Sequence, residues 1–202
     1  MTADAVQAAY SAVAAVYIEM FGDGRQDHED DVELVTRHLT GLAGPVLDVG
    51  CGPGHWTALL HRLGVEVTGV DVVPEFLVHA RATHPDVRYR RGSMTDLGAP
   101  EGSLAGILAW YSTIHLLPAD LPSVLAGFRA ALAPGGRLVV GFFDGDDGVA
   151  PFDHKVATAY RWPVAVLAEQ LATAGFAELE RVRREGPAGS DRRYAAIAAR
   201  AS

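Results

Sequence analysis

Two hydrophobic patterns divide the chain. Up to about residue 43, apolar positions recur every three or four residues, the period of an amphipathic helix. The first predicted helix spans 3–21, and its apolar face is formed by Val6, Ala9, Val13, Val16, Tyr17 and Met20. A polar loop with two glycines, 22–31, separates it from a second predicted helix that begins at Val32. We interpret residues 1–43 as a helical cap.

After Pro45, short β-rich runs alternate with helical stretches. The predicted strands are 46–51, 65–71, 87–92, 104–111 and 136–143, and the helices between them are 55–63, 75–82 and 121–132. A helix over 163–174 then precedes two final strands, 176–184 and 194–199. This alternation predicts an α/β fold with a mostly parallel sheet covered on both faces. Ligands of such sheets bind at the carboxyl ends of the strands.

Composition and charge narrow the possible functions. The chain has 202 residues, 49% of them hydrophobic and 21% charged, which predicts a folded protein with one domain over 1–202. A formal net charge of −8 argues against a nucleic-acid partner. The N-terminal residues lack a secretory signal, and no apolar run is long enough to cross a membrane, so we expect a cytoplasmic protein.

Missing residue types exclude some chemistries. The chain has no asparagine, which excludes a Cys/His/Asn protease, and its one lysine is Lys155. A phosphate-binding P-loop needs lysine directly after its last glycine, where this chain has His55. The single Cys51 cannot form an internal disulfide, and the eight histidines show no metal-binding spacing.

The glycine-rich run GCGPG at 50–54 follows a predicted buried strand and precedes a helix. Backbone N–H groups at such a turn can approach a ligand without obstruction by side chains. A dinucleotide-binding loop would have glycine at position 55, where this chain has histidine, so a different adenine-containing cofactor is favoured. Asp71 ends the next strand, where an acid typically accepts hydrogen bonds from ribose hydroxyls. The alternative is that Asp71 caps the following helix.

These segments together resemble a known family. Residues 46–56 and 67–71 resemble the first two motifs of class I S-adenosylmethionine-dependent methyltransferases, of the small-molecule type. Residues 133–143 resemble the fifth-strand turn of that family, and 10–22 is similar to its N-terminal helix. The resemblance implies a doubly wound, seven-stranded Rossmann-like sheet whose last strand is antiparallel. It also implies S-adenosyl-L-methionine as cofactor and S-adenosyl-L-homocysteine as product.

The resemblance assigns roles to individual residues. It implies that the glycine loop holds the methionine part of the cofactor, that Asp71 holds the ribose, and that Val72 packs on the adenine. Ser93 stands where the family often has an acid that binds the adenine, so we assign Ser93 and Met94 to the pocket. The predicted cofactor-binding residues are Tyr17, Asp48, Gly50, Cys51, Gly52, Gly54, Asp71, Val72, Ser93, Met94 and Trp110.

The methyl acceptor is expected beside the carboxyl end of the fourth strand. His115 and His154 are the candidate proton acceptors, and the segment 144–163 is expected to be a loop on the substrate side. The predicted substrate-binding residues are Tyr10, Tyr111, His115, Tyr160, Arg161 and Trp162. The alternatives are that His115 packs at the start of a helix and that Arg161 clamps the sheet edge. Methyl transfer needs alignment of the reacting atoms and no metal.

The sequence therefore predicts a methyltransferase that acts on O, N, S or C of a small metabolite, as a monomer or homodimer. One alternative is a relative that binds S-adenosylmethionine but performs another reaction. A second alternative is a non-catalytic binding module or partner subunit. A nicotinamide-dependent dehydrogenase is disfavoured by the histidine at position 55.

Overall fold

The computed structural model describes residues 2–25, 27–187 and 189–202. Its helices are α1 (Ala3–Phe21), α2 (Glu29–Leu39), α3 (His55–Arg62), α4 (Pro74–Thr83), α5 (Leu121–Ala131) and α6 (Val164–Thr173), with a 3₁₀ turn at Thr113–His115. Its strands are β1 (Val46–Val49), β2 (Val67–Asp71), β3 (Arg88–Arg91), β4 (Leu104–Trp110), β5 (Leu132–Asp144), β6 (Ala150–Asp153), β7 (Thr158–Trp162), β8 (Phe176–Glu185) and β9 (Arg193–Ala201). Among the described residues, no helix is both long and apolar enough to span a bilayer.

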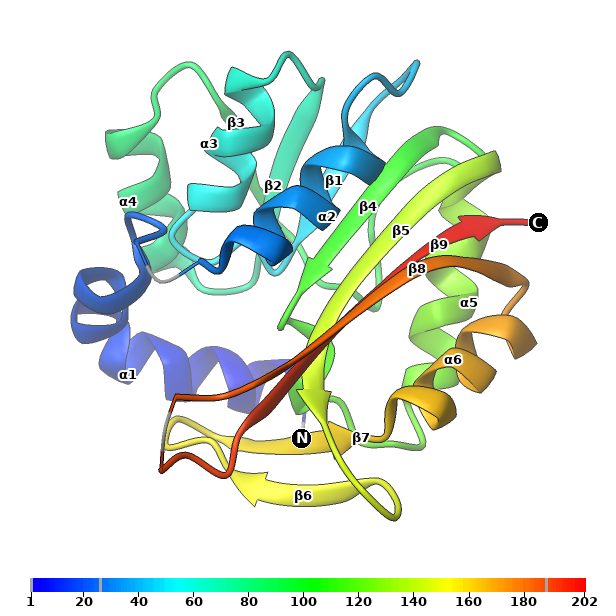
Figure 1. The fold of residues 1–202 in the computed structure, drawn as a ribbon. Coiled ribbons are helices and arrows are strands. Elements are labelled where there is room, and N and C mark those ends of the chain that lie inside the picture. The colour runs from blue at the N-terminus through cyan, green and yellow to red at the C-terminus, as the bar shows by residue number, and fades with distance from the viewer. Residues whose placement is uncertain (1, 26, 188) are drawn as a thin grey trace.

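The sheet confirms the predicted α/β fold. Strands β3, β2, β1, β4 and β5 are parallel and adjacent in that order, β9 runs antiparallel to β5, and β8 pairs with β9 (Figure 1). One face is covered by α5 and α6 through side chains such as Phe128 and Leu167. The other face is covered by α2 and α3 through Leu39 and Leu60. The antiparallel last strand and the helices on both faces are as predicted.

The segment 144–163 differs from the expected loop. Most of it forms the hairpin of β6 and β7, and β7 pairs with the end of β5 at Phe143 and Asp144. Among the described residues the sheet therefore has nine strands, and the predicted number of seven is wrong. Trp162 and Ala159 are buried by this pairing. Ala159 packs with Ile114 and with Phe143 of β5, so the hairpin covers an apolar surface at the end of β5. The glycines and aspartates at 144–148 predict only the turn that leads into it.

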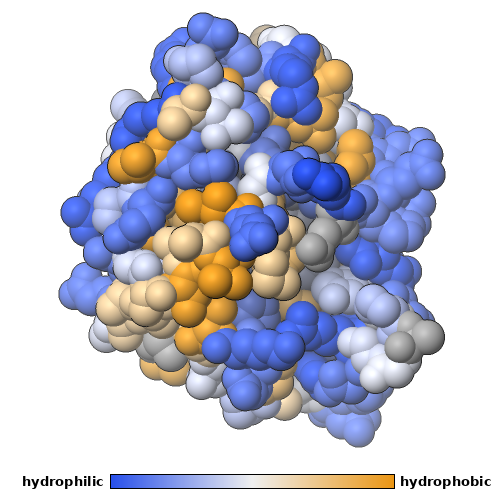
Figure 2. All heavy atoms as spheres, turned by 90° about the vertical axis from the view of Figure 1, so that its left-hand side faces the viewer, coloured by the Kyte–Doolittle hydropathy of each residue, from blue (hydrophilic) through white to orange (hydrophobic). Residues whose placement is uncertain are grey.

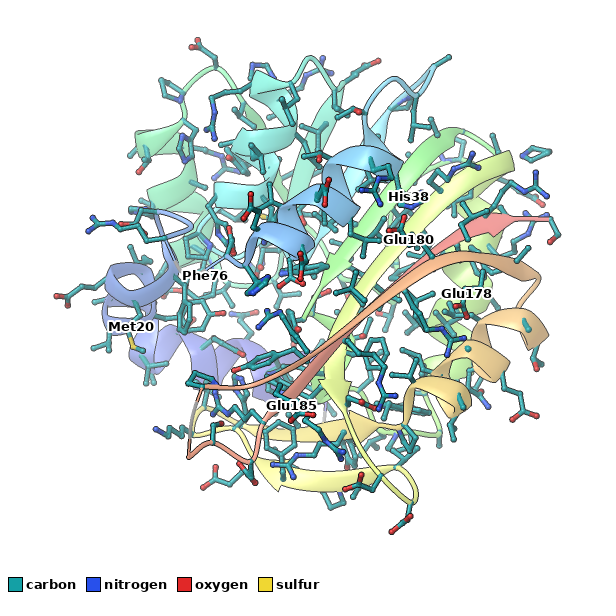
Figure 3. All side chains as sticks on the ribbon, in the orientation of Figure 1. Met20, His38, Phe76, Glu178, Glu180 and Glu185 are labelled. Carbon is teal, nitrogen blue, oxygen red and sulfur yellow. The ribbon has the colours of Figure 1, made fainter. Side chains whose placement is uncertain are left out.

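Helix α1 has the predicted bounds but not the predicted apolar face. Its buried residues are Tyr10 and Ala14, whereas Val13, Val16 and Met20 are 37%, 59% and 49% exposed. The helix packs through its tyrosines against Phe76 of α4, with the rings of Tyr10 and Phe76 6.0 Å apart. Figure 2 shows apolar side chains gathered on this side of the molecule, and Met20 lies on the outer side of α1 in Figure 3.

Polar contacts at two places join α2 to β8, and at the first of them Glu180 accepts from Arg37 as well as facing His38. His38 and Glu180 face each other across the gap between these elements, with 2.8 Å between His38 Nε2 and a Glu180 carboxylate oxygen (Figure 3). Closer to the carboxyl ends of the parallel strands, Arg184 donates to the buried carboxylate of Asp31. The second contact places a guanidinium beside the end of the sheet where a ligand is expected.

The core on the α5 side predicts a stability experiment. Phe128 is fully buried among apolar side chains, so Phe128→Ala is expected to cost about 3–5 kcal/mol of the free energy of unfolding. Val78 of α4 is 66% exposed, and Val78→Ala is expected to change it by less than about 0.5 kcal/mol. Urea denaturation of both variants measures the difference. Equal midpoints would contradict this packing.

Candidate active site

The glycine loop after β1 leaves bare main chain at the end of the sheet. Gly50 and Gly52 have φ of 76° and 53°, in the left-handed region. A Cβ at Gly50 would lie 2.3 Å from the Ser112 Cβ, so only glycine fits there. No atom lies within 4 Å of the position that a Cβ would take at Gly52. That space belongs to a cavity, and the loop is therefore a cradle open to a ligand.

Gly54 has a different role from the other two loop glycines. It also has a positive φ, 96°, and it is the N-cap of α3. A Cβ there would lie 2.7 Å from the Tyr89 hydroxyl and 2.8 Å from the Ala80 Cβ. Gly54 borders none of the three cavities described below. Because Gly54 has no side chain, the start of α3 can pack closely against α4 and β3.

Asp71 holds the loop in place. One carboxylate oxygen accepts a hydrogen bond from Gly52 N and the other from Val73 N, both at 2.8 Å. Burial raises the pKa of Asp71, and the two backbone hydrogen bonds act against that rise. The side chain also borders a cavity together with Gly50 and Gly52. Asp71 therefore ties the loop to Val73, the N-cap residue of α4, and it lies where a ligand could reach it. The alternative that Asp71 itself caps this helix is wrong, because α4 has no side-chain cap hydrogen bond.

Two more titratable side chains lie at the loop: Asp48, two residues before Gly50, and Cys51 within the loop. Asp48 is fully buried and accepts a hydrogen bond from Thr57 Oγ1 at 2.6 Å, and burial raises its pKa to about 6. Cys51 is also buried, and burial raises the pKa of its thiol well above the usual range. A protonated thiol is a poor nucleophile, so Cys51 serves as a small side chain that fits the loop.

Three connected cavities surround the loop. The outer cavity, about 370 Å³, is bordered by residues that include Val72, Ser93, Met94, Ser112 and His115. The middle cavity, about 100 Å³, is bordered by residues that include Tyr10, Tyr17, Gly50, Gly52, Asp71, Val72, Met94 and Trp110. The aromatic cavity, about 210 Å³, is bordered by residues that include Asp48, Cys51, Trp56, Tyr111, Phe143, His154, Arg184, Arg192 and Tyr194. Shared lining residues join the outer cavity to the middle one and the middle cavity to the aromatic one, so together they form one elongated groove.

Among the described residues, six buried polar atoms beside these cavities have no hydrogen-bond partner. They are His55 Nδ1, Trp56 Nε1, Tyr111 OH, Ser112 Oγ, His154 Nδ1 and Arg184 Nε. A buried polar group without a hydrogen bond costs about 1–3 kcal/mol, so such groups are rare in folded proteins. Six of them beside one groove indicate that a polar ligand completes the site.

Tyr111 has a strained backbone at the end of β4. Its φ is 49°, a conformation that costs a non-glycine residue about 1–3 kcal/mol and that occurs often at functional sites. Its N–H donates to Gly141 O at 3.0 Å, which fixes the turn. The ring lies 5.1 Å from that of Phe143 and borders both the middle and the aromatic cavity. Burial raises the pKa of its hydroxyl, which stays protonated.

His115 is engaged at both ring nitrogens. Its Nδ1 lies 2.9 Å from Thr158 O, and its Nε2 lies 2.8 Å from the Tyr10 hydroxyl. Because a carbonyl only accepts, Nδ1 carries the hydrogen and Nε2 accepts from Tyr10. Burial lowers the pKa of His115 and keeps the ring neutral. This geometry favours a role in fastening α1 to β7 over the role of proton acceptor.

His154 has a free acceptor position. Its Nδ1 has no partner among the described residues, and its ring packs 5.5 Å from Phe143 and 5.4 Å from His115. Burial, with help from the nearby His115 and Arg192, lowers the pKa of His154 to about 4. The ring is neutral near pH 7, and it can accept a hydrogen bond from a molecule in the aromatic cavity.

The other three predicted substrate-binding residues lie outside the groove. Trp162 is buried in the core on the α5 side, and Tyr160 packs against its margin. Arg161 forms an ion pair with Asp191 at 2.6 Å and stacks over Phe152. None of the three borders the outer, middle or aromatic cavity. Arg161 ties β7, an inner strand of the sheet, to Asp191, so the alternative of a clamp on the sheet edge is wrong.

Sequence reasoning missed several residues of the aromatic cavity. Arg184 and Tyr194 are paired across the β8–β9 hairpin, and Arg192 precedes β9. The sequence signal that could have found them is the pair of arginine-rich runs on either side of the turn at 186–192. From sequence alone, this segment is typical of a hairpin at the surface. Trp56 and Phe143 were also missed, because apolar aromatic residues next to strands are typical of a core.

Asp48 predicts a pH effect on stability. Its pKa is raised to about 6 in the folded chain, so the folded state binds this proton more tightly than the unfolded chain does. That stabilisation is present below about pH 4 and is lost as the pH rises through about 6. Asp48→Asn has no such carboxyl group and should not show this loss. As the pH rises from about 4 to above 6, its free energy of unfolding should therefore increase relative to that of wild type by up to about 3 kcal/mol.

Urea denaturation at several pH values measures this difference in the free energy of unfolding. Asp86→Asn at an exposed position is the control for a change of charge alone. A constant difference between Asp48→Asn and wild type across the acid range would contradict the prediction.

Comparisons with known proteins agree with this geometry. Residues 46–136 match the family described as a methyltransferase domain. Protein-L-isoaspartate O-methyltransferase 1 of Anaeromyxobacter sp. (strain Fw109-5) is 40% identical over 103 residues, which are 51% of this chain and 47% of that protein. The ubiquinone biosynthesis O-methyltransferase of Xanthomonas axonopodis pv. citri (strain 306) is 31% identical over 111 residues, 53% of this chain and 46% of that protein. This chain therefore spans about half the length of the curated relatives it matches.

A solved structure extends the likeness to nearly the whole chain. It is the 1,6-didemethyltoxoflavin-N1-methyltransferase of Burkholderia thailandensis with bound 1,6-didemethyltoxoflavin and S-adenosylhomocysteine. The two chains are 27% identical and superpose with a TM-score of 0.74, over 97% of this chain and 90% of the other. The similarity thus includes α1 and the hairpins beyond the matched domain.

Proposed function

We propose that this chain is a class I S-adenosylmethionine-dependent methyltransferase and that it transfers a methyl group from S-adenosylmethionine to an O, N, S or C atom of a small molecule. The observation that carries the proposal is the groove of three connected cavities against the bare main chain at Gly50 and Gly52. The groove lies at the carboxyl ends of parallel strands, where ligands of such sheets bind. The orphaned polar atoms along it fit a ligand with many hydrogen-bonding groups.

The residues of the groove suit the parts of S-adenosylmethionine. Gly50 and Gly52 would hold the amino-acid part, because backbone there is unobstructed. Asp71 keeps lone pairs beyond its two backbone bonds and would accept from the ribose hydroxyls. Val72 and Met94 border both the outer and the middle cavity and would enclose the adenine. When bound, S-adenosylmethionine supplies an electrophilic methyl carbon on a positively charged sulfur.

The residues of this chain would position the two reacting molecules and exclude water from the site. The hydroxyl of Tyr10 bonds to His115 and keeps α1 over the middle cavity, where Tyr17 also lies. Trp110 and Tyr111, at the end of β4, separate that cavity from the aromatic one and border both. An acceptor held in the aromatic cavity would thus face the methyl position at short range, and alignment of this kind supplies much of the catalysis in a displacement reaction.

The remaining parts of the proposal come from the sequence. We assign one methyltransferase domain to 1–202, with residues 1–43 as its cap and 144–163 on its substrate side. The net charge of −8 supports a small acceptor over a nucleic acid. The lone Cys51 supports a cytoplasmic location, and a monomer or a homodimer is proposed.

Calorimetry with S-adenosylhomocysteine tests the proposed function. The purified chain is expected to bind it, and its thermal midpoint should rise with S-adenosylhomocysteine and stay constant with NAD. Detection of S-adenosylhomocysteine formed from S-adenosylmethionine in the presence of acceptor mixtures then tests the transfer. Absence of binding in calorimetry would overturn the proposal.

Two glycine variants locate the binding site. Gly52 and Gly64 both have positive φ, 53° and 83°, and both have open space where a Cβ would lie, so each Ala variant bears a similar backbone strain. Only Gly52 borders the groove. Gly52→Ala is expected to weaken S-adenosylhomocysteine binding by at least about tenfold, roughly 1.4 kcal/mol, and Gly64→Ala to leave it unchanged. Equal affinities of the two variants would contradict the placement of the ligand.

A further inference from the structure

The unpaired polar atoms of the groove are concentrated on the aromatic cavity. Five of the six belong to side chains that border this cavity. They are His55 Nδ1, Trp56 Nε1, Tyr111 OH, His154 Nδ1 and Arg184 Nε. Because buried polar groups in folded proteins nearly always have a partner, a ligand with several hydrogen-bonding groups fits this cavity.

The side chains around the cavity form two groups, which Trp110 joins. In the first group, His55 and Trp56 begin α3 directly after the glycine loop, where the amino-acid part of S-adenosylmethionine is proposed to bind. The ring of Trp110 lies 5.1 Å from that of Trp56 and 5.4 Å from that of Tyr111. Tyr111 and His154 belong to the second group, beyond Trp110. Their polar atoms are therefore left for the second reactant.

Four aromatic rings form the second group, which we call the ring cluster: Tyr111, Phe143, His154 and Tyr194. The ring of Phe143 lies 5.1 to 5.5 Å from each of the other three, and the planes of these pairs are inclined by 41° or more, from 47° to 57°. No ring of the cluster thus stacks face to face on Phe143. Aromatic side chains bind planar rings by offset stacking and edge contacts, so the cluster suits a planar ligand.

Charged side chains of both signs also border the aromatic cavity. They are Asp27, Asp31, Asp48, Arg184 and Arg192. Asp31 accepts from Arg184, and Asp48 accepts from Thr57. The carboxylate of Asp27 lies 3.4 Å from His55 Nε2. Charge therefore selects neither an anion nor a cation here, and recognition depends on ring shape and on hydrogen bonds.

The two polar groups of the ring cluster are uncharged near pH 7. Burial raises the pKa of Tyr111, and it lowers the pKa of His154 to about 4. A hydroxyl both donates and accepts, and a neutral imidazole nitrogen does one or the other according to its tautomer. The turn with φ of 49° at Tyr111 holds this side chain between the middle and the aromatic cavity. Tyr111 and His154 can thus hold a polar ring compound in one orientation beside the methyl position.

We propose that the methyl acceptor is a planar ring compound that binds within the ring cluster, and that the Tyr111 hydroxyl and His154 Nδ1 orient it through hydrogen bonds to polar groups on that ring. The proposal rests on the proposed methyl transfer. The two side chains determine which atom of the ring compound faces the methyl position.

Titrations followed by the NMR signals of three probes test the recognition of a planar polar ring. Naphthalene-2,6-diol is planar, is uncharged at pH 7 and carries hydroxyls at opposite ends. Naphthalene lacks the hydroxyls, and decahydronaphthalene-2,6-diol has them on a saturated skeleton that is not planar. With S-adenosylhomocysteine at saturating concentration, naphthalene-2,6-diol should bind at least about fivefold more tightly than either of the other two probes.

Two variants test the hydrogen bonds. Tyr111→Phe and His154→Phe each keep an aromatic ring and remove one of the two polar atoms. Each should weaken the binding of naphthalene-2,6-diol by about three- to tenfold and leave that of naphthalene unchanged. A change in the shape of the cavity would alter both affinities alike, so the difference between the probes reports the hydrogen bond. Tyr111→Phe should also not lower the thermal midpoint of the unliganded chain, because the hydroxyl has no partner among the described residues.

Matched control variants make the same changes outside the groove. Tyr160→Phe removes a hydroxyl from a side chain that borders none of the three cavities, and His61→Phe replaces an exposed histidine of α3. Both controls should bind all three probes with the affinity of the wild type.

The outcomes separate this proposal from the proposed function. A variant that changes the affinities for naphthalene-2,6-diol and naphthalene by the same factor overturns the orienting role of that residue. Equal affinities of the wild type for the planar and the saturated diol overturn the ring site. Both results leave the methyltransferase in place if the wild type binds S-adenosylhomocysteine. If it does not, the methyltransferase is overturned, and the titrations repeated without S-adenosylhomocysteine still decide whether the ring cluster binds planar polar rings.

Discussion

The carboxylate of Asp71 sets the geometry on which the rest of the site depends. It is buried at the end of β2, and a buried charge must be matched by donors. The donors are the backbone N–H groups of Gly52 and Val73, which lie on either side of the groove floor. One side chain thereby fixes the glycine loop relative to the start of α4. The middle cavity exists between these two segments, and the outer and aromatic cavities open from it.

The elements that follow local rules were predictable from the sequence. The bounds of α1, α3 and β4, and the turn at Gly50 and Gly52, come from periodicity and from glycine's access to positive φ. Asp71 was found because its position after the second strand has a known use in open sheets. Val72 and Trp110, which the sequence places at the carboxyl ends of parallel strands, both border the middle cavity.

The parts that escaped prediction depend on contacts between distant segments. Helix α1 buries the face that packs against Phe76 of α4. The apolar pattern of α1 alone does not show whether the face with Tyr10 or the face with Val13 and Val16 will be covered. His115 is identifiable as a histidine near the site, but its engagement by Tyr10 and Thr158 needs α1 and β7 in place. Arg192 stands among several arginines in the sequence, and its place beside the aromatic cavity is known only once the hairpin of β8 and β9 is folded.

The close approach of Gly50 to Ser112 couples two positions that are far apart in the chain. The serine side chain fills the volume that any side chain at position 50 would need. The combined size allowed at these two positions is therefore about that of one small residue. A side chain at position 50 would displace the turn after β4, so the end of β1 and that turn are constrained to change in concert as the sequence diverges.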